Sequence, residues 1–305
     1  MRILLFGANG QVGHELRRAL TPLGNLVCAT RSGLLGDGAP CEVADFDHPA
    51  TLPALVDRIA PDVVVNAAAY TAVDKAEAER DAAFRANAEA PNALAQACAE
   101  RDALLVHYST DYVFDGSGTR PYREDDPTSP LGVYGASKLA GEQAVQGSGA
   151  RHLIFRTAWV YATHGRNFML TMLRLAKERD ELRVVADQIG TPTPAALIAD
   201  TTAAILAQPF RGSGLWHLTA SGQTSWHGFA SAIVAEAEAR SLIARLPTVV
   251  PIDTRDYPTP ARRPAYSCLD PGALTADFDM RLPTWQAGLS AVLDGIAPPR
   301  ATGTA

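Results

Sequence analysis

The chain has 305 residues, of which 47% are hydrophobic and 20% charged, an ordinary balance for a globular protein of one or two domains. Its formal net charge of -6 and the lack of any basic run exclude nucleic acid as the main ligand, because phosphate-backbone binding needs a positive surface. No apolar stretch reaches the roughly 18 residues of a membrane span, and the N-terminal apolar run is too short for a signal peptide, so we expect a cytoplasmic protein.

In chain order, short runs rich in β-branched residues alternate with longer alanine-rich segments of helical period. The alternation predicts strands and helices in turn, at 2–6, 12–20, 62–68, 80–100, 103–109, 138–146 and 152–161. Such βαβ units build a parallel sheet with helices on both faces. We therefore predict an α/β protein with a Rossmann-type doubly wound parallel sheet.

The pattern loosens after about residue 165. Helices are expected at 167–179, 194–207 and 226–239, strands at 181–185 and 215–220, and loops and a tail where prolines cluster, at 247–264 and 297–298. The order predicts a dinucleotide-binding domain at 1–165 with a returning segment at about 195–220. A smaller C-terminal substrate-binding lobe is expected at 166–194 and 221–296, and a disordered tail at 297–305.

A glycine loop follows the first expected strand: GANGQVG, at 7–13, leads directly into a helix. Such a loop lets the main chain approach a pyrophosphate, whose charge is favoured at a helix N-terminus. Glycines at strand–helix turns also serve packing, which is the alternative interpretation. We expect dinucleotide binding by the loop residues Gly7, Asn9, Gly10, Gln11, Val12 and Gly13.

The second expected strand, 25–30, ends in Thr30 and Arg31 and not in the acidic residue that grips the adenosine ribose of NAD. An arginine here can pair with a 2′-phosphate, so NADPH is the expected cofactor, with NADH tolerated; a solvated surface arginine is the alternative. Further cofactor contacts are expected at later strand ends, from Asp45 and Phe46, flanking the adenine, and from Ala68, Ala69 and Tyr70.

The stretch YGASK, at 134–138, places Tyr134 and Lys138 four residues apart, on one face of an expected helix. A phenol titrates near 10 when unperturbed, and a neighbouring ammonium and an oxidised nicotinamide would lower its pKa. Tyr134 would then protonate a carbonyl oxygen as hydride arrives at its carbon, while Lys138 holds the nicotinamide ribose. The alternative is a helix-surface pair.

Hydroxyl groups at the end of the strand at 103–109 favour the catalytic interpretation. Ser109 and Thr110 fall at the carboxyl end of this strand, on the same sheet edge as the glycine loop. A hydroxyl there can hydrogen-bond a substrate carbonyl and share its proton with the tyrosine. The glycine loop, the hydroxyl pair and Tyr-x-x-x-Lys occur in this order along the chain.

Taken together, these stretches resemble the extended short-chain dehydrogenase/reductases, and within them the dTDP-4-dehydrorhamnose reductases. The resemblance runs from residue 1 to about 295 and rests on GANGQVG, VNAAAYTAVDKAE, HYSTDYVFDG, SPLGVYGASKLAGE, RTAWVY, NFMLTMLRLAKER and YPTPARRP. It implies that Thr110, Tyr134 and Lys138 are catalytic and that Asp111 and Trp159 contact the substrate. The implied activity is NAD(P)H-dependent reduction of the 4-keto group of dTDP-4-dehydro-L-rhamnose to dTDP-L-rhamnose.

Further substrate contacts are expected from residues later in the chain. Trp159 follows a strand at the sheet edge, where its indole face could pack on the deoxysugar ring; core packing is the alternative. Arg262 and Arg263 are candidates for the substrate diphosphate, because guanidinium binds phosphate bidentately; salt bridges at the surface or an interface are the alternative. Asn167, with Phe168, is expected to line the same pocket.

The sequence departs from the resemblance in one respect. Some members are expected to form dimers bridged by magnesium through glutamates, one of them just after the G-x-P-T stretch, but GTPTPAALIAD has none, although Glu15 is retained. A metal-bridged dimer is therefore in doubt, and no metal ligand is assigned. The cysteines Cys28, Cys41, Cys98 and Cys268 lack zinc-site spacing and are expected to be structural thiols. A homodimer without a bridging metal stays open.

Two rival functions also stay open. The same triad serves other nucleotide-sugar 4-ketoreductases and epimerases, so the fold does not separate them. A non-catalytic regulatory subunit of the same fold is the rival from another class, and the intact Thr110, Tyr134 and Lys138 argue against it. In each case the expected partner is a small nucleotide-sugar ligand and neither nucleic acid nor a membrane.

Overall fold

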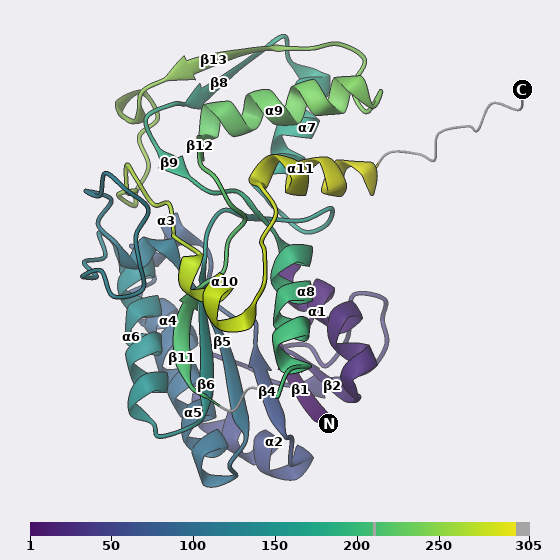
Figure 1. Ribbon diagram of the computed structural model, residues 1–305, viewed down its shortest axis with the longest axis vertical. Coiled ribbons are helices and arrows are strands. Elements are labelled where there is room, and N and C mark those ends of the chain that lie inside the picture. Colours follow the sequence, from purple (N-terminus) through teal and green to yellow (C-terminus); the bar gives the residue numbers. More distant parts are fainter. Residues whose placement is uncertain (210–211, 297–305) are drawn as a thin grey trace, which may run out of the picture.

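The computed structural model describes residues 1–209 and 212–296. A larger domain contains a seven-stranded sheet, and a smaller lobe lies beyond one end of its strands, at the top of Figure 1. The tail expected at 297–305 lies outside the described residues. Within the two described ranges, no helix combines the length and the apolar character needed to cross a bilayer.

The sheet of the larger domain is parallel throughout, with strand order β11-β6-β5-β4-β1-β2-β3. Its strands are β1 (Arg2–Phe6), β2 (Asn25–Thr30), β3 (Glu42–Val43), β4 (Val63–Asn66), β5 (Leu104–Thr110), β6 (His152–Thr157) and β11 (Gly214–His217). The central strands are almost wholly buried, as their continuous apolar runs require in a sheet covered on both faces. The predicted doubly wound sheet is confirmed.

Helices cover both faces of the sheet (Figure 1). On one face α1 (Gln11–Leu20) and α8 (Ala195–Leu206) bury Leu16, Leu20 and Ile198 in one apolar cluster. The other face is covered by α2 (Leu52–Ile59), α5 (Ala90–Glu100) and α6 (Val133–Gly147). Shorter helices precede α5: α3 (Val73–Ala76), α4 (Arg80–Phe84) and a π-helical turn (Arg85–Glu89).

The strand order fixes where a ligand can lie. From β1 the chain first moves outward to β2 and β3, and then returns to the other side of β1 to add β4, β5, β6 and β11. The order reverses between β1 and β4, and ligands of open α/β sheets bind outside the carboxyl ends of the strands at such a point. The glycine loop after β1 and the polar ends of β4 and β5 meet there.

The smaller lobe has a core of its own, built around Met169, Phe229, Ile233, Trp285 and Leu289. Its helices are α7 (Phe168–Glu178), α9 (Trp226–Ala239) and α11 (Trp285–Asp294). Three two-stranded sheets complete it, pairing β8 (Glu181–Val185) with β13 (Thr248–Ile252), β7 (Val160–Tyr161) with β10 (Thr193–Pro194), and β9 (Ile189–Gly190) with β12 (Thr224–Ser225).

Two features differ from the expectations. The segment at 247–264, predicted as loop because of its prolines, contains β13, which tolerates Pro251 because it belongs to a sheet of only two strands. In addition, α10 (Gly272–Phe278) lies beside β11 of the large sheet (Figure 1). The Trp216 and Phe278 rings pack there with centroids 5.1 Å apart. The domain boundaries stay a prediction, and this contact argues for assigning α10 to the larger domain.

Candidate active site

The glycine loop has the geometry of a close turn under a helix N-terminus. Gly7 has a φ of +76°, and a Cβ on it would lie 2.6 Å from the main-chain nitrogen of Ala68. A Cβ on Gly13 would overlap the carbonyl oxygen of Gly7. Gly10 caps α1 without any side-chain hydrogen bond to the first turn. The loop thus presents main chain, free of side-chain caps, at the positive end of a helix dipole, which fits a pyrophosphate.

The loop after β4 is held by a buried asparagine that the sequence analysis missed. The side chain of Asn87 accepts a hydrogen bond from the Tyr70 main-chain nitrogen (2.8 Å) and donates to the Tyr70 carbonyl (3.0 Å) and to Ser137 Oγ (3.0 Å). It therefore joins the loop containing Ala68 and Ala69 to α6. Asn87 lies in the π-helical turn, a feature frequent at functional sites.

Lys138 is buried in the interior, only 2% exposed, on the face of α6 that packs against β5. Its ammonium nitrogen donates a hydrogen bond of 2.6 Å to the carbonyl oxygen of Tyr108 and lies 3.5 Å from His107 Nε2. Burial lowers its pKa to about 8. A buried cation with so few partners is unusual unless it has a function.

Tyr134 lies one turn before Lys138 on α6 and lines a small pocket that also includes Tyr112 and Arg262. Burial raises the pKa of Tyr134, and a hydrogen bond with Thr110 opposes the rise. We expected the Lys138 ammonium and an oxidised nicotinamide to lower this pKa, but in the structure burial is the largest influence on it, and the ammonium hydrogen-bonds Tyr108 on β5. The phenol thus keeps its proton at neutral pH, as a proton donor must.

Thr110 ends β5 and begins a short 3-10 turn, Asp111–Val113. Its hydroxyl donates to Asp111 Oδ1 at 3.0 Å and accepts from the Tyr112 main-chain nitrogen at 3.2 Å. Asp111 is 3% exposed, and burial raises its pKa to about 6. A hydrogen bond with the Thr110 hydroxyl also lowers the pKa of Tyr134, so the two side chains lie close together; their catalytic role stays a prediction.

A glutamate outside the predicted set fixes the start of α6. Glu77 Oε1 accepts a hydrogen bond of 2.9 Å from the main-chain nitrogen of Val133, the first residue of the helix. The N-cap residue, Gly132, supplies no side-chain cap, and a Cβ there would lie 2.6 Å from the same oxygen. A remote carboxylate thus caps the helix that contains Tyr134 and Lys138.

The residues expected around the adenosine half of the cofactor are split between two environments. Arg31 is 70% exposed and lies between two carboxylates, 3.3 Å from Asp45 and 3.5 Å from Asp47. Phe46, in contrast, is 6% exposed and packs edge-to-face on Phe6 in the core. Its contacts therefore favour a packing role over adenine stacking.

The expected substrate residues after β6 belong to the smaller lobe. Trp159 has a φ of +46°, uncommon for a bulky residue, and its indole stacks on Trp226 with ring centroids 3.5 Å apart. Asn167 caps α7, and its amide nitrogen donates to Gln11 Oε1 at 2.8 Å. This bond ties the first turn of α1 to the smaller lobe. The tight stacking of Trp159 corresponds to the packing alternative.

The two arginines of the TPARRP stretch have different partners. Arg263 pairs with Asp74 at 2.8 Å, and Asp74 also accepts a hydrogen bond from the main-chain nitrogen of Ala261. Arg262 is exposed and lines the pocket that contains Tyr134. Arg263 thus has the salt bridge that was the alternative to diphosphate binding, while Arg262 lies beside the predicted proton donor.

A chain of buried polar side chains next to Lys138 was not foreseen. Asn66, at the end of β4, lies opposite His107 of β5 and contacts its Nδ1 at 3.2 Å, and His107 Nε2 faces Lys138. Burial, and then the charge of Lys138, keep the pKa of His107 well below its usual value. Polar residues that interrupt the apolar runs of β4 and β5 were the signal available in the sequence.

The sequence was compared with known families and proteins. The model of the RmlD substrate binding domain family matches residues 1–297. The chain is 52% identical over 295 residues to a dTDP-4-dehydrorhamnose reductase of Burkholderia thailandensis, covering 94% of this chain and 96% of that protein. It is 48% identical over 297 residues to the enzyme of the same name from Escherichia coli, covering 96% and 97%.

A solved structure is similar over nearly its whole length. The dTDP-4-dehydrorhamnose reductase of Bacillus anthracis in complex with NADP superposes with a TM-score of 0.87 at 34% identity. The match covers 96% of this chain and 99% of that one.

Proposed function

The chain belongs to the family of the RmlD substrate binding domain, and from that premise we propose that it reduces the 4-keto group of dTDP-4-dehydro-L-rhamnose to dTDP-L-rhamnose. Its relatives at 46% to 52% identity have the name dTDP-4-dehydrorhamnose reductase. The observation that carries the proposal is the arrangement at the ends of β5 and α6: Thr110 hydrogen-bonds Tyr134, with buried Lys138 one helical turn further on.

The cofactor of this reaction is NADPH, as the NADP complex of the Bacillus anthracis enzyme supports. The glycine loop at 7–13 and the N-terminus of α1 hold the pyrophosphate, because main-chain amides and a helix dipole favour that charge. Arg31 forms an ion pair with the 2′-phosphate, which replaces its ion pairs with Asp45 and Asp47. NADH is accepted less well, since it offers this arginine no phosphate.

The reduced nicotinamide supplies a hydride to C4 of the sugar. Tyr134 donates its phenolic proton to the oxygen of the former ketone, so that a C–H and an O–H bond form and the phenolate remains. Thr110 turns its hydroxyl proton from Asp111 Oδ1 to the same oxygen and orients this oxygen toward the phenol. The Lys138 ammonium stabilises the phenolate through its charge, and a proton from solvent restores the phenol.

The nucleotide sugar lies between the end of β5 and the smaller lobe. Asp111 hydrogen-bonds the sugar, and Arg262, beside Tyr134, holds the diphosphate. Trp159 and Asn167 line the wall of the pocket. The indole face of Trp159 stacks on Trp226, so Trp159 contacts the substrate with its ring edge. Arg263 acts indirectly, through its ion pair with Asp74, which fixes the loop beside Arg262.

One assay separates this function from its rivals. The purified chain is incubated with dTDP-4-dehydro-L-rhamnose and NADPH or NADH, the nicotinamide absorbance is followed, and the product is identified. The proposal expects stoichiometric oxidation of NADPH and formation of dTDP-L-rhamnose. An epimerase recycles its cofactor and a regulatory subunit turns nothing over, so either behaviour would contradict the proposal. A different sugar product would identify another 4-ketoreductase.

The compartment and the assembly state belong to the same proposal. The cytoplasm is supported by the free thiols of Cys28, Cys41, Cys98 and Cys268, which are typical of a reducing compartment. A homodimer is proposed on the family resemblance alone and without a magnesium bridge. Light scattering of the purified chain tests it, and a monomeric mass at assay concentration would contradict it.

A further inference from the structure

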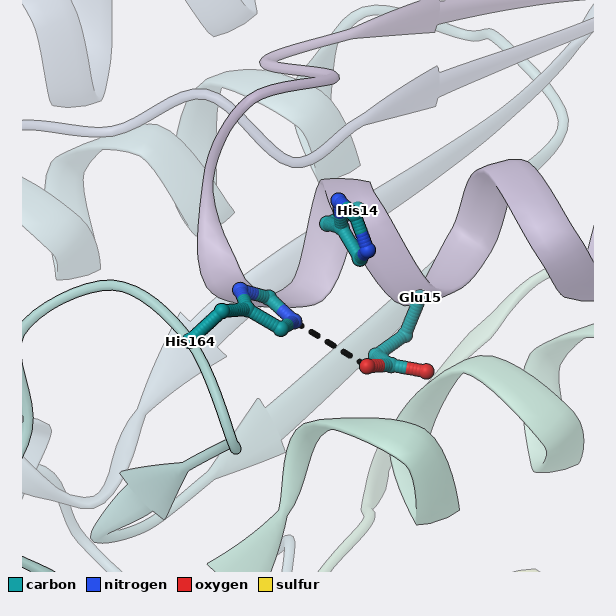
Figure 2. Close-up of side chains that lie close together, drawn as sticks. All are labelled: His14, Glu15 and His164. Carbon is teal, nitrogen blue, oxygen red and sulfur yellow. Dashed lines mark hydrogen bonds and ion pairs between the residues drawn. The ribbon is translucent and has the colours of Figure 1, made fainter. Parts of the chain in front are cut away.

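Three donor side chains gather where α1 meets the loop before α7. His14 and Glu15 are neighbours in α1, and His164 approaches them from the smaller lobe. Figure 2 shows the His164 imidazole pointing at the Glu15 carboxylate, with the His14 ring beside both. His164 Nε2 lies 3.0 Å from Glu15 Oε1, and the two imidazole rings have centroids 4.2 Å apart. One donor atom from each residue lies within 4.8 Å of the others.

The chemistry of these donors selects one class of metal ion. Two imidazole nitrogens and one carboxylate oxygen suit Zn²⁺ and its first-row neighbours, whereas Mg²⁺ prefers oxygen ligands. Bonds of about 2.0 to 2.2 Å in a tetrahedron place the donor atoms about 3.3 to 3.6 Å apart. The 3.0 Å between Glu15 and His164 is already close to this range. His14, which is exposed, has room to close the rest by side-chain rotation.

We propose that His14, Glu15 and His164 form a binding site for one Zn²⁺-class divalent ion within a single chain. Water completes the coordination on the exposed side next to His14. Two of its residues belong to α1, which covers the opposite face of the sheet from α6 with Tyr134 and Lys138, so the ion takes no part in the reduction. It also differs from a magnesium bridge between subunits, because two of its three ligands are imidazoles and all three come from one chain.

The expected effect is to fasten the smaller lobe to the cofactor-binding helix. His164 is three residues before Asn167, whose amide donates to Gln11 Oε1 in the first turn of α1. Gly165, with a φ of +75°, lies against the Gln11 side chain, so the loop already touches α1 there. One helical turn further along, a bound ion replaces the contact between His164 and Glu15 with coordinate bonds and adds His14 to this attachment.

Arg18 competes with a metal ion for the Glu15 carboxylate. Arg18 Nε lies 3.6 Å from Glu15 Oε2 and its guanidinium also pairs with Asp200 at 2.6 Å. When a metal ion coordinates the Glu15 carboxylate, Arg18 can keep its ion pair with Asp200. Binding therefore needs no arginine to be left without a carboxylate partner.

The test is a metal titration of the whole protein after removal of metals with a chelator. Zn²⁺ is titrated by calorimetry and Co²⁺ by its visible absorption, which reports coordination geometry. The proposal expects one ion per chain in the wild type. His14→Gln, His164→Gln and Glu15→Gln should each weaken binding by about tenfold or more. His152→Gln, which removes a histidine of β6 outside the cluster, should leave it unchanged. Equal affinity in all variants, or no binding, would overturn the site.

The melting temperature and the molecular mass distinguish a site within one chain from a metal bridge between chains. Zn²⁺ should raise the melting temperature of the wild type and of His152→Gln, but not of the folded His164→Gln variant, because only a bound ligand stabilises by mass action. Light scattering during the titration should show no change in mass. One ion per two chains together with a doubled mass, or displacement of Co²⁺ by equimolar Mg²⁺, would overturn the single-chain site. None of these readouts depends on reductase activity.

Discussion

The ammonium nitrogen of Lys138 lies 2.6 Å from the carbonyl oxygen of Tyr108, so the charge one helical turn after Tyr134 is attached to the main chain of β5. Side-chain substitutions in β5 leave this oxygen in place. The Lys138 side chain therefore spans from α6 to the sheet, and its position depends on how closely that helix packs on β5.

The first prediction concerns the proton donor. Tyr134→Phe keeps the ring and its packing but removes the transferable proton, so kcat should fall by about 10² to 10⁴ while cofactor affinity stays nearly constant. Steady-state kinetics under chemistry-limited conditions, with cofactor titrations, measure both. Tyr112→Phe is the matched control, since its ring lies 5.8 Å away, and should retain most of the turnover. Near wild-type turnover in Tyr134→Phe would remove the catalytic assignment.

The second prediction uses the lowered pKa of Lys138. Because this pKa is about 8 in the folded protein and 10.5 ordinarily, the unfolded chain binds more protons between these values. The free energy of unfolding should therefore rise with pH from about 8 to 10.5, as the lysine of the folded protein becomes neutral. Below pH 8 the buried lysine is charged, and the full cost of burying that charge lowers the stability. Over the same window kcat/KM should fall, because the field of the ammonium is lost.

Denaturant unfolding and steady-state kinetics, measured at the same series of pH values, test whether stability rises while kcat/KM falls. Lys138→Met is the reference, because it removes the titrating group, and the stability difference between wild type and variant should shrink or reverse toward high pH. The variant should also bind cofactor more weakly and turn over more slowly at neutral pH. A constant stability difference across the window would show that Lys138 titrates at its ordinary pKa.

The third prediction addresses cofactor selectivity. Arg31→Ala should weaken NADPH binding by about tenfold and leave NADH nearly unchanged; the low end of the charge-assisted range applies because Arg31 is 70% exposed and screened. Asp47→Asn removes a competing carboxylate and should not weaken NADPH binding. Calorimetric titration with each cofactor measures the effects. Equal losses for both cofactors in Arg31→Ala would rule out the 2′-phosphate contact.

The fourth prediction concerns the remote cap of α6. Glu77→Ala removes the acceptor for the Val133 main-chain nitrogen and should destabilise the protein by about 0.5 to 2 kcal/mol, nearer the lower figure because Glu77 is exposed. Glu77→Gln keeps an acceptor and should recover most of the stability. Denaturant unfolding measures both. If the alanine and glutamine variants are equally stable, the hydrogen bond is not what stabilises the helix start.

The fifth prediction separates neighbouring arginines. Arg262→Ala should raise KM for the nucleotide sugar and make it less sensitive to salt, since a phosphate contact is lost. Arg263→Ala breaks the ion pair with Asp74 and should change stability by no more than about 1 kcal/mol, because both side chains are partly exposed. Kinetics at two salt concentrations and thermal unfolding distinguish them. An unchanged KM in Arg262→Ala would leave diphosphate binding without support from this stretch.

The predictable part of the molecule is local in sequence. The sequence predicts β1, β2, β4, β5 and β6 directly from short apolar runs, and Gly7 to Gly13 and YGASK are contiguous motifs with a known physical use. Asn87 and Glu77 were missed because their partners, Tyr70 and Val133, are 17 and 56 residues away. Contacts of that separation leave no periodic signal. The burial of Phe46 was not predicted for the same reason. It packs against Phe6, which is distant in sequence, and this contact depends on how the helices and loops cover the sheet.

The position of β11 determines the order in which the chain can fold during synthesis. β11 pairs with β6, and α8 packs on α1, yet both follow the first half of the smaller lobe in sequence. A nascent chain that has produced only residues up to β6 has an open sheet edge and an uncovered apolar face beside α1. Closing them requires contacts of large sequence separation, which form slowly. Truncation before residue 217 should therefore yield an aggregation-prone chain, even though the glycine loop, Tyr134 and Lys138 are all present in it.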